Sequence, residues 1–213
     1  MQSIIRLHHR SGALGRTWVR RCSDYQFMEN VSGTSIKFGI VAAMSKNGII
    51  GVNGDLPWSL PEDRKIFMGL TRNRILIIGR RTFEEHPQLA HINHTRYCIV
   101  VSRTLQHIKP DAVHAPNTQL LSATSLSEAI RLAGETWKDV APDAEANMDA
   151  KGLFCWVAGG ESIYREALSQ SSASELHLSV VDVDIDASKY YPQQVARFPS
   201  LELWREYAYR RKS

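Results

Sequence analysis

Five runs of apolar residues, each of a length that suits one β-strand, are spread along the chain. Several are apolar without alternation, which is typical of strands covered on both faces of a sheet. Helical patterns separate them, and the box Ser125-x-x-Glu128 marks the start of one helix. The predicted strands are Phe38 to Met44, Ile75 to Ile78, Tyr97 to Val101, Leu153 to Ala158 and Leu176 to Val181; the predicted helices are Pro61 to Thr71, a short one from Thr82, Leu126 to Ala133 and Glu161 to Leu168. This alternation predicts an α/β fold with a mainly parallel sheet and right-handed crossovers.

Size and charge indicate one globular domain after a basic leader. The 213 residues are 43% hydrophobic, which is enough for one substantial core. The net charge is +4, but the first 23 residues hold five arginines and no acid, and subtracting those five charges leaves −1 for residues 24–213. Binding to nucleic acid is not expected, because it needs basic charge clustered on the folded surface. No run of about 18 apolar residues is present, so no membrane-spanning helix is expected.

Residues 1–35 form the predicted leader, and residues 36–213 form the predicted domain. The leader is rich in arginine, contains serine, lacks acids in its first 23 residues and places apolar residues among its charges. This composition is typical of a mitochondrial transit peptide. The alternatives are a disordered basic tail, or a cytoplasmic protein whose translation starts at Met28.

Cysteine and histidine usage predicts neither a disulfide framework nor a metal site. The cysteines, Cys22, Cys98 and Cys155, are far apart, and the last two lie in apolar strand-like runs where a thiol behaves as a small hydrophobe. His91 and His94 have metal-like spacing without an evident third ligand. Residues 134–152 are polar and unpatterned, and we expect a surface insertion without chemistry there.

Groups that suit phosphate follow three of the predicted strands. These segments are Gly79-Arg80-Arg81-Thr82, Ser102-Arg103 and Gly159-Gly160-Glu161-Ser162. Ligands of open α/β sheets bind beyond the carboxyl ends of the strands, where arginine and the N–H groups of a glycine turn bind anions well. A dinucleotide would use all three segments, although solvated arginines and an ordinary turn remain the alternative. The Gly-x-Gly-x-x-Gly and Walker lysine loops are absent, which disfavours ordinary Rossmann and P-loop proteins.

The segment from Gly54 to Phe67 is a loop with two prolines that leads into a helix. Asp63 in the first turn suits the helix dipole, but it also shares the i, i+3, i+4, i+7 stripe of Ile66, Phe67 and Leu70. The carboxylate is therefore expected to point inward. A buried carboxylate needs a partner, and since no cation shares the stripe, a ligand with two N–H donors would suit it. Its raised pKa would be useful in acid chemistry.

Taken together, the motifs of residues 37–192 resemble those of dihydrofolate reductase. The resemblance rests on ordered motifs at compatible spacing: Ile40 to Met44, Gly48 to Gly51, the loop Leu56 to Asp63 with Phe67, Gly79 to Glu84, Ser102-Arg103 and Val157 to Tyr164. It implies a three-layer α/β/α fold with a mainly parallel sheet and an antiparallel C-terminal edge, either complete or shortened. It also implies a cis peptide bond between Gly159 and Gly160.

The resemblance implies reduction of 7,8-dihydrofolate to 5,6,7,8-tetrahydrofolate by NADPH, a reaction of one-carbon metabolism, and we expect a monomer. Asp63 would grip the 2-amino and N3 edge of the pterin and assist protonation of N5, while hydride goes to C6. A water near Trp58 and Ser179 would relay the proton, and Leu56 with Trp58 would belong to a closing loop. The implied substrate residues are Val41, Ala42, Leu56, Asp63, Arg64, Phe67, Arg96 and Tyr164, with Arg96 for the glutamate tail.

The resemblance also assigns an NADPH site to the strand ends. Arg80, Arg81 and Arg103 would grip the ribose 2′-phosphate, which favours NADPH over NADH. The implied cofactor residues are Ala43, Ile50, Gly51, Gly79, Arg80, Arg81, Thr82, Ser102, Arg103, Gly159, Gly160, Glu161, Ser162 and Ile163.

The chain departs from the family pattern at four places. The family closes with two strands after its aromatic-proline pair, but only 21 residues follow Pro192, with one plausible strand from Leu201 to Tyr209. Three alternatives stay open for the missing strand: Leu201 to Tyr209 takes its place in the sheet, a partner supplies it, or the chain is an incomplete version of a longer protein. In the segment Ser188-Lys189-Tyr190-Tyr191-Pro192, other residues replace the family's aspartate-threonine pair before the aromatic-proline pair. Arg64 occupies a position beside Asp63 that is often apolar in the family. Ser179 replaces the family's usual threonine.

Two other functions stay open at this stage. A catalytically weak relative that binds NADPH, folate or a protein is supported by the short C-terminal end. A reductase of the riboflavin pathway would share the fold and NADPH, but it would not be expected to carry the Leu56 to Asp63 motif together with Arg96.

Overall fold

A computed structural model describes residues 5–8, 17–21, 36–85, 92–104, 118–144 and 153–199. Side chains are described from residue 36 onward within these ranges, and in 118–144 only as far as residue 137. Within the described parts of the chain, no helix is long and apolar enough to cross a membrane.

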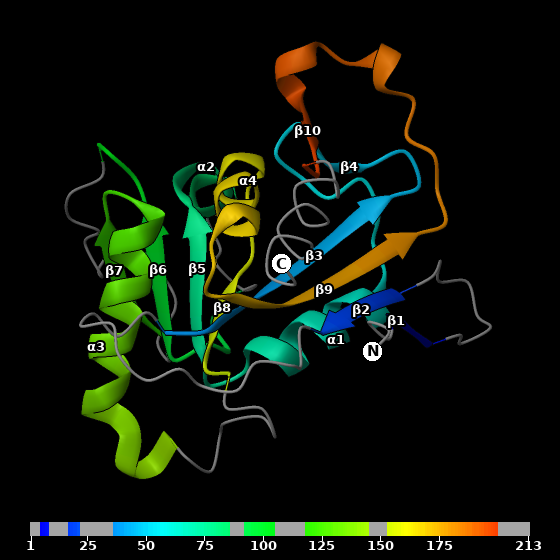
Figure 1. Ribbon diagram of the computed structural model, residues 1–213. Coiled ribbons are helices and arrows are strands. Elements are labelled where there is room, and N and C mark those ends of the chain that lie inside the picture. The colour runs from blue at the N-terminus through cyan, green and yellow to red at the C-terminus, as the bar shows by residue number, and fades with distance from the viewer. Residues whose placement is uncertain are drawn as a thin grey trace.

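The main sheet has eight strands in the order β1-β2-β9-β3-β8-β5-β6-β7 (Figure 1). The six strands from β9 to β7 are mutually parallel, and β2 and β1 add an antiparallel edge beside β9. The bounds are β1 Ile5–His8, β2 Thr17–Arg21, β3 Phe38–Ser45, β5 Ile75–Gly79, β6 Tyr97–Val101, β7 Gln119–Ala123, β8 Cys155–Val157 and β9 Ala173–Val181. The mainly parallel sheet with an antiparallel edge is confirmed. The prediction that this edge is C-terminal is wrong for the described strands, because β2 from the N-terminal segment pairs beside β9.

Successive residues of the central strands face two different cores. On one face, Ile75, Ile77 and Ile99 pack against helices α3 (Leu126–Ala144) and α4 (Glu161–Ser169). On the other, Leu76 and Ile78 lie in a second cluster with Trp156, against which α1 (Pro61–Thr71) and α2 (Arg80–Glu84) pack through Phe67 and Phe83. Both faces are covered, so the unbroken apolar runs in the sequence are explained and the three-layer prediction is confirmed.

A two-stranded antiparallel sheet lies beside the carboxyl end of β3. Its strands are β4 (Ile49–Val52) and β10 (Val195–Arg197), and short 3-10 turns at Ala187–Lys189 and Pro192–Gln194 precede β10. Figure 1 shows this unit projecting above the main sheet. It brings a segment that follows β9 next to the loop that leads to α1.

The prediction of a structureless insertion from residue 134 is wrong for its first part. Helix α3 continues to Ala144, because Trp137 extends the buried stripe of Ala129 and Ala133 and stacks on Phe154 at a ring distance of 4.6 Å. Residues 145–152 lie outside the described residues. The box at the start of α3 is also shifted, since the Glu128 carboxylate accepts from the Thr124 N–H while the Glu128 N–H donates to the Ser125 hydroxyl.

The other differences lie at element ends and in short strands. Strand β8 is shorter than the predicted Leu153 to Ala158, β9 begins at Ala173 rather than Leu176, and the second helix begins at Arg80 rather than Thr82. Strands β4, β7 and β10 were not predicted, because each is short and only partly apolar. The proposed strand Leu201 to Tyr209 and His91 lie outside the described residues.

Candidate active site

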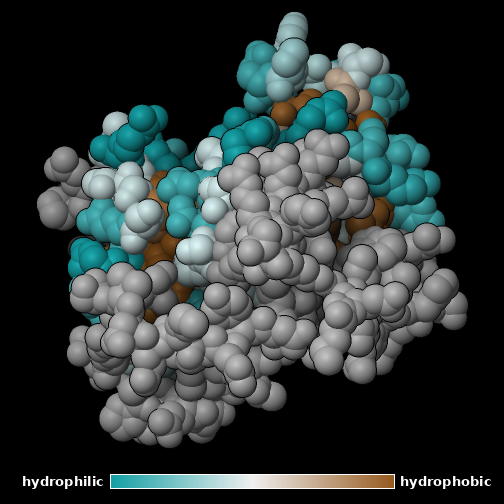
Figure 2. Space-filling view, viewed as in Figure 1, coloured by the Kyte–Doolittle hydropathy of each residue, from teal (hydrophilic) through white to brown (hydrophobic). Residues whose placement is uncertain are grey.

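An open cleft of about 1320 Å³ runs across the carboxyl ends of the parallel strands. On this side of the molecule, Figure 2 shows polar residues on the described protrusions and apolar residues in the recesses between them. The cleft brings together nearly all of the predicted site residues: Val41, Ala42, Ala43, Ile50, Gly51, Leu56, Trp58, Asp63, Arg64, Phe67, Gly79, Arg80, Arg81, Thr82, Ser102, Arg103, Gly159, Gly160, Glu161, Ser162, Ile163 and Tyr164. Its volume is large enough for a nucleotide and a second ring-shaped ligand.

Asp63 lies in the first turn of α1 and lines the middle of the cleft. Pro61 occupies the start of this helix, where its missing N–H costs nothing. Burial raises the pKa of the Asp63 carboxyl, and a hydrogen bond from Ser179 and the nearby Trp58 indole act against that rise. The predicted inward direction of Asp63 and its raised pKa are therefore found in the structure.

Trp58 and Ser179 approach the carboxylate from two different elements. Ser179 is buried on β9, outside the cleft lining, and reaches Asp63 through its hydroxyl. The Trp58 indole nitrogen is near enough to lower the pKa of Asp63, but it is buried and makes no direct hydrogen bond of normal geometry. A buried N–H of this kind needs an acceptor, and a bound water or a ligand atom would satisfy it.

Tyr164 ties the helix α4 to the substrate side of the cleft. Its buried hydroxyl donates to the Val41 carbonyl oxygen at 2.9 Å. Burial, and then the negative charge of Asp63, raise the pKa of the Tyr164 hydroxyl well above its usual value. The phenol thus stays protonated and serves as a fixed wall beside Asp63.

Phe67 on α1 lines the cleft and also contacts the loop before β6. The ring of Phe67 lies edge-on to His94 at 5.6 Å, and the Thr71 hydroxyl contacts the His94 Nε2 at 2.6 Å. Arg64 also lines the cleft, beside Asp63. Among the described residues, no ion pair or hydrogen bond engages its guanidinium.

Arg96 is the predicted substrate residue that the cleft does not include. Its side chain is exposed, and its backbone N–H donates to the Arg74 carbonyl at the start of β5. In this arrangement Arg96 continues the sheet pairing ahead of β6. Its assignment to the glutamate tail rests on the resemblance alone.

Glycine backbone forms the centre of the nucleotide side. The Gly159-Gly160 peptide bond is cis, as the resemblance implied, and the Gly79 N–H donates to the Gly159 carbonyl at 2.7 Å. A Cβ atom at Gly160 would lie only 3.1 Å from the Thr82 hydroxyl oxygen. Because α4 begins at Glu161, this narrow passage leads to the positive end of a helix dipole.

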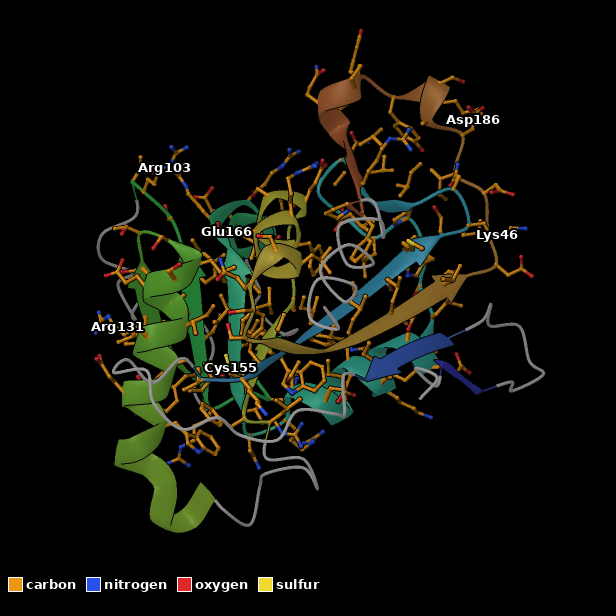
Figure 3. All side chains as sticks on the ribbon, viewed as in Figure 1. Lys46, Arg103, Arg131, Cys155, Glu166 and Asp186 are labelled. Atoms are coloured by element: carbon orange, nitrogen blue, oxygen red, sulfur yellow. The ribbon has the colours of Figure 1, made fainter. Side chains whose placement is uncertain are left out.

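Three arginines lie around the outer end of the nucleotide side. Arg80 pairs with Glu84 and donates to the Thr104 hydroxyl; Arg81 pairs with Glu85 at 2.6 Å. Arg103 follows β6, is exposed and extends away from the sheet (Figure 3). It has no ion pair or hydrogen bond with any described residue, so its guanidinium is available to a ligand.

Several cleft residues were missed by sequence reasoning. Val195 and Ala196 of β10 line the cleft because β10 pairs with β4 next to Ile50 and Gly51. Thr104, Thr124 and Ser125 line the nucleotide side, and Glu85 lies near Gly54. The strand-end rule would have found Thr124 and Ser125 if β7 had been predicted. No local signal indicates β10.

The described residues contain no group of three or more histidine, cysteine or acidic side chains that could hold a metal ion. Cys98 and Cys155 are buried free thiols, and burial raises the pKa of both. Neither cysteine lines the cleft, so the chemistry of the site rests on Asp63 and its neighbours.

Comparisons with known proteins agree with this geometry. The family model described as dihydrofolate reductase matches residues 37–208. The chain is 31% identical to dihydrofolate reductase type 5 of Escherichia coli, over 74% of this chain and 82% of that protein, and 29% identical to the Rattus norvegicus dihydrofolate reductase, over 72% and 77%. The solved structure of the Enterococcus faecalis dihydrofolate reductase, complexed with NADP(H) and RAB-propyl, superposes with a TM-score of 0.51 at 22% identity, covering 77% of each chain. This chain belongs to the dihydrofolate reductase family.

Proposed function

We propose that this protein reduces 7,8-dihydrofolate to 5,6,7,8-tetrahydrofolate with NADPH. The observation that carries the proposal is one cleft that joins a half-buried carboxyl of raised pKa, Asp63, to strand ends built from glycine and arginine. The carboxyl suits a ring with adjacent N–H donors, and the strand ends suit a phosphorylated nucleotide. A site and its chemistry thus support the function, together with membership of the family.

The residues present fit NADPH. Gly159 has a positive φ of 121° that favours glycine, and a Cβ at Gly160 would crowd the Thr82 hydroxyl. This backbone lies at the start of α4, where a pyrophosphate would be held by N–H groups and by Thr82. Arg103, whose guanidinium has no partner among the described residues, suits a 2′-phosphate, while Ala43, Ile50 and Gly51 provide an apolar wall for the nicotinamide. NADPH, when bound, supplies the hydride that goes to C6 of the substrate.

On the substrate side, Asp63 binds and orients the pterin. Its carboxyl accepts from the 2-amino and N3 edge, which lies flat between Phe67 on α1 and the wall of Val41, Ala42 and Tyr164. Burial raises the pKa of Asp63, which makes its carboxyl a better proton carrier than an exposed aspartate, and we assign to it the assistance of N5 protonation. Hydride arrival at C6 and proton arrival at N5 complete the reduction.

Trp58 and Leu56 serve proton transfer and exclusion of solvent. The unpartnered indole N–H of Trp58 holds a water between itself, Ser179 and Asp63, and this water passes the proton. Leu56 is 51% exposed on the loop before α1, although it is apolar and lines the cleft. Closing that loop over the ligands would bury Leu56 and exclude bulk water from the reaction.

The direct test is loss of nicotinamide absorbance when the full chain is mixed with dihydrofolate and NADPH. Asp63→Asn should lower kcat/KM at least about a hundredfold, the usual scale for loss of a positioned proton donor. Glu62→Gln is the matched control, because Glu62 is exposed on the same helical turn, lies outside the cleft and removes the same charge. Folded protein that binds NADPH without turning over dihydrofolate would support a binding-only role instead.

We propose further that the protein serves one-carbon metabolism as a monomer, and that its basic leader directs it to mitochondria. The arginine-rich, initially acid-free composition of residues 1–35 supports import. A fluorescent reporter fused behind residues 1–35 should accumulate in mitochondria, and replacing the five arginines by glutamine should return it to the cytoplasm. Sedimentation of the purified chain measures its oligomeric state and tests whether it is a monomer.

A further inference from the structure

Strand β9 carries Ser179 and has a partner on each side. On one side β3 runs parallel to it and places Ala43 opposite Ser179. On the other side β2 runs antiparallel, with five residue pairs that start at Thr17↔Ser179 and end at Arg21↔Glu175 (Figure 1). The N-terminal segment therefore pairs along the part of β9 that carries an active-site hydroxyl.

Ser179 lies near the end of β9, so the pairing of β9 with β2 affects how firmly its hydroxyl is held. Ser179 is two residues from the end of the strand, and beyond Val181 the chain continues through the exposed Asp182. Among the described strands, β2 is the one that covers this side of β9, so without β2 the N–H and C=O groups on that side would lose their described partners next to the site. Strand ends held by few backbone hydrogen bonds open most readily, so the Ser179 hydroxyl would lose its fixed position first.

We propose that the hairpin formed by β1 and β2 is a positioning element of the active site, which holds β9 in register and thereby keeps the Ser179 hydroxyl on the Asp63 carboxylate. The inference rests on the proposed function for its kinetic consequences, but the pairing itself can be measured without turnover. It gives the leader a role inside the enzyme, in addition to any role as an address.

The link to Asp63 determines the direction of the effect. The Ser179 hydrogen bond favours the charged carboxylate and lowers the pKa of Asp63 against the larger effect of burial. When β2 is displaced, Asp63 loses that bond and its pKa rises further. A cut in residues 22–35 would free the hairpin from the domain, so proteolytic removal of the leader would weaken the site that it helps to hold.

The test is a proline scan of Thr17 to Arg21 in the full chain. Alternate N–H groups of a central antiparallel strand point to its two neighbours, so prolines at Thr17, Val19 and Arg21 remove donors to one neighbour, and prolines at Trp18 and Arg20 remove donors to the other. Val19→Ile is the matched control, because it keeps the N–H and suits a strand. Amide exchange of Leu176 to Val181 and NMR titration of the Asp63 carboxyl report on each variant.

The proline set that removes the N–H donors facing β9 should speed amide exchange in β9 about tenfold and raise the pKa of Asp63. The other proline set should have a smaller effect on both. A double-mutant cycle then separates positioning from general loosening. Ser179→Ala alone should raise the pKa of Asp63, and a β2 proline added to it should raise that pKa no further. In turnover, the same variants should lower kcat more than they raise KM and should move the high-pH limb of the rate to higher pH.

If none of the five prolines changes exchange in β9 or the titration of Asp63, the positioning role is wrong. The role is also wrong if prolines shift the titration equally in the Ser179→Ala background. Failure of the proposed function looks different: the unaltered chain would not oxidise NADPH with dihydrofolate, while Asp63 would still titrate and respond to the prolines.

Discussion

Tyr164 on α4 donates its hydroxyl proton to the carbonyl of Val41 on β3 at 2.9 Å, which links the nucleotide half of the cleft to the pterin half. The two residues are 123 positions apart in the chain, and both line the cleft. The bond occupies a carbonyl at the inner wall of the substrate pocket. The hydrogen bond therefore fixes the position of α4 relative to the wall beside Asp63.

Replacing Tyr164 by phenylalanine should destabilise the fold by about 1–3 kcal/mol, because it leaves the buried Val41 carbonyl without a donor. The ring and its packing against Phe198 would remain. Urea unfolding measures the loss, and the KM for dihydrofolate should rise as the pocket wall loosens. Tyr191→Phe is the matched control, since Tyr191 is 69% exposed and lies outside the cleft. Equal stability of both variants would show that the bond contributes nothing.

Asp63→Asn should stabilise the fold at neutral pH although it lowers kcat/KM. Burial raises the pKa of Asp63 in the folded state, so above the unfolded value of 3.8 the folded state holds the proton more tightly than the unfolded chain. Stability from this group is therefore present at low pH and is lost as pH rises through the folded pKa. Urea midpoints of the two proteins should converge near pH 4 and separate toward pH 7. A variant that is less stable at pH 7 would contradict this view of Asp63.

His94 should make the fold sensitive to acid. Thr71 donates its single hydroxyl proton to the Phe67 carbonyl, which leaves its oxygen to accept from His94 Nε2, and the bare Nδ1 is buried without a partner. Burial, and then Arg72 and Arg64, lower the pKa of His94 from 6.5 to about 4. The unfolded chain binds the proton first, so stability is complete above pH 6.5 and falls as pH drops toward 4.

His94→Gln should flatten the stability profile in that window, measured by urea unfolding at half-unit steps of pH. Arg72→Gln should act in the same direction by a smaller amount, because it removes only one of the positive charges near the ring. Unchanged acid sensitivity in both variants would assign the effect to other groups.

Gly39→Ala should destabilise the sheet by roughly 1–3 kcal/mol or more. An added Cβ would lie 2.5 Å from a ring carbon of Trp156, a fully buried side chain that fills the second core. Gly69→Ala is the control, because nothing lies within 4 Å of its Cβ position on the exposed side of α1, where alanine favours the helix. Thermal unfolding should lower Tm for the first variant and raise it slightly for the second.

Features of the molecule with a local sequence pattern could be predicted, and features that depend on pairing of distant strands could not. Unbroken apolar runs predicted β3, β5 and β6 because both sheet faces are covered, and the Asp63 stripe predicted an inward carboxyl because helix periodicity is local. The positions of β2 and β10 depend on pairing with strands far away in the chain, and neither segment has a distinctive pattern. Long-range register is therefore the part that local reasoning missed, and it is what places Val195 in the cleft and Thr17 opposite Ser179.

Arg103 should decide between NADPH and NADH. It is the arginine of the nucleotide side that has no ion pair or hydrogen bond with described residues, whereas Arg80 and Arg81 are held by Glu84 and Glu85. Binding of a phosphate by Arg103 does not require an existing ion pair with a described residue to break. Arg103→Ala should therefore weaken NADPH binding by about 1.5–3 kcal/mol and leave NADH binding nearly unchanged. Fluorescence titration with both nucleotides measures the ratio. Arg131→Ala on α3 is the control, because Arg131 is exposed and outside the cleft. If affinity for both nucleotides fell equally in Arg103→Ala, the guanidinium would be contacting a part that they share, and selectivity would rest on Arg80 and Arg81.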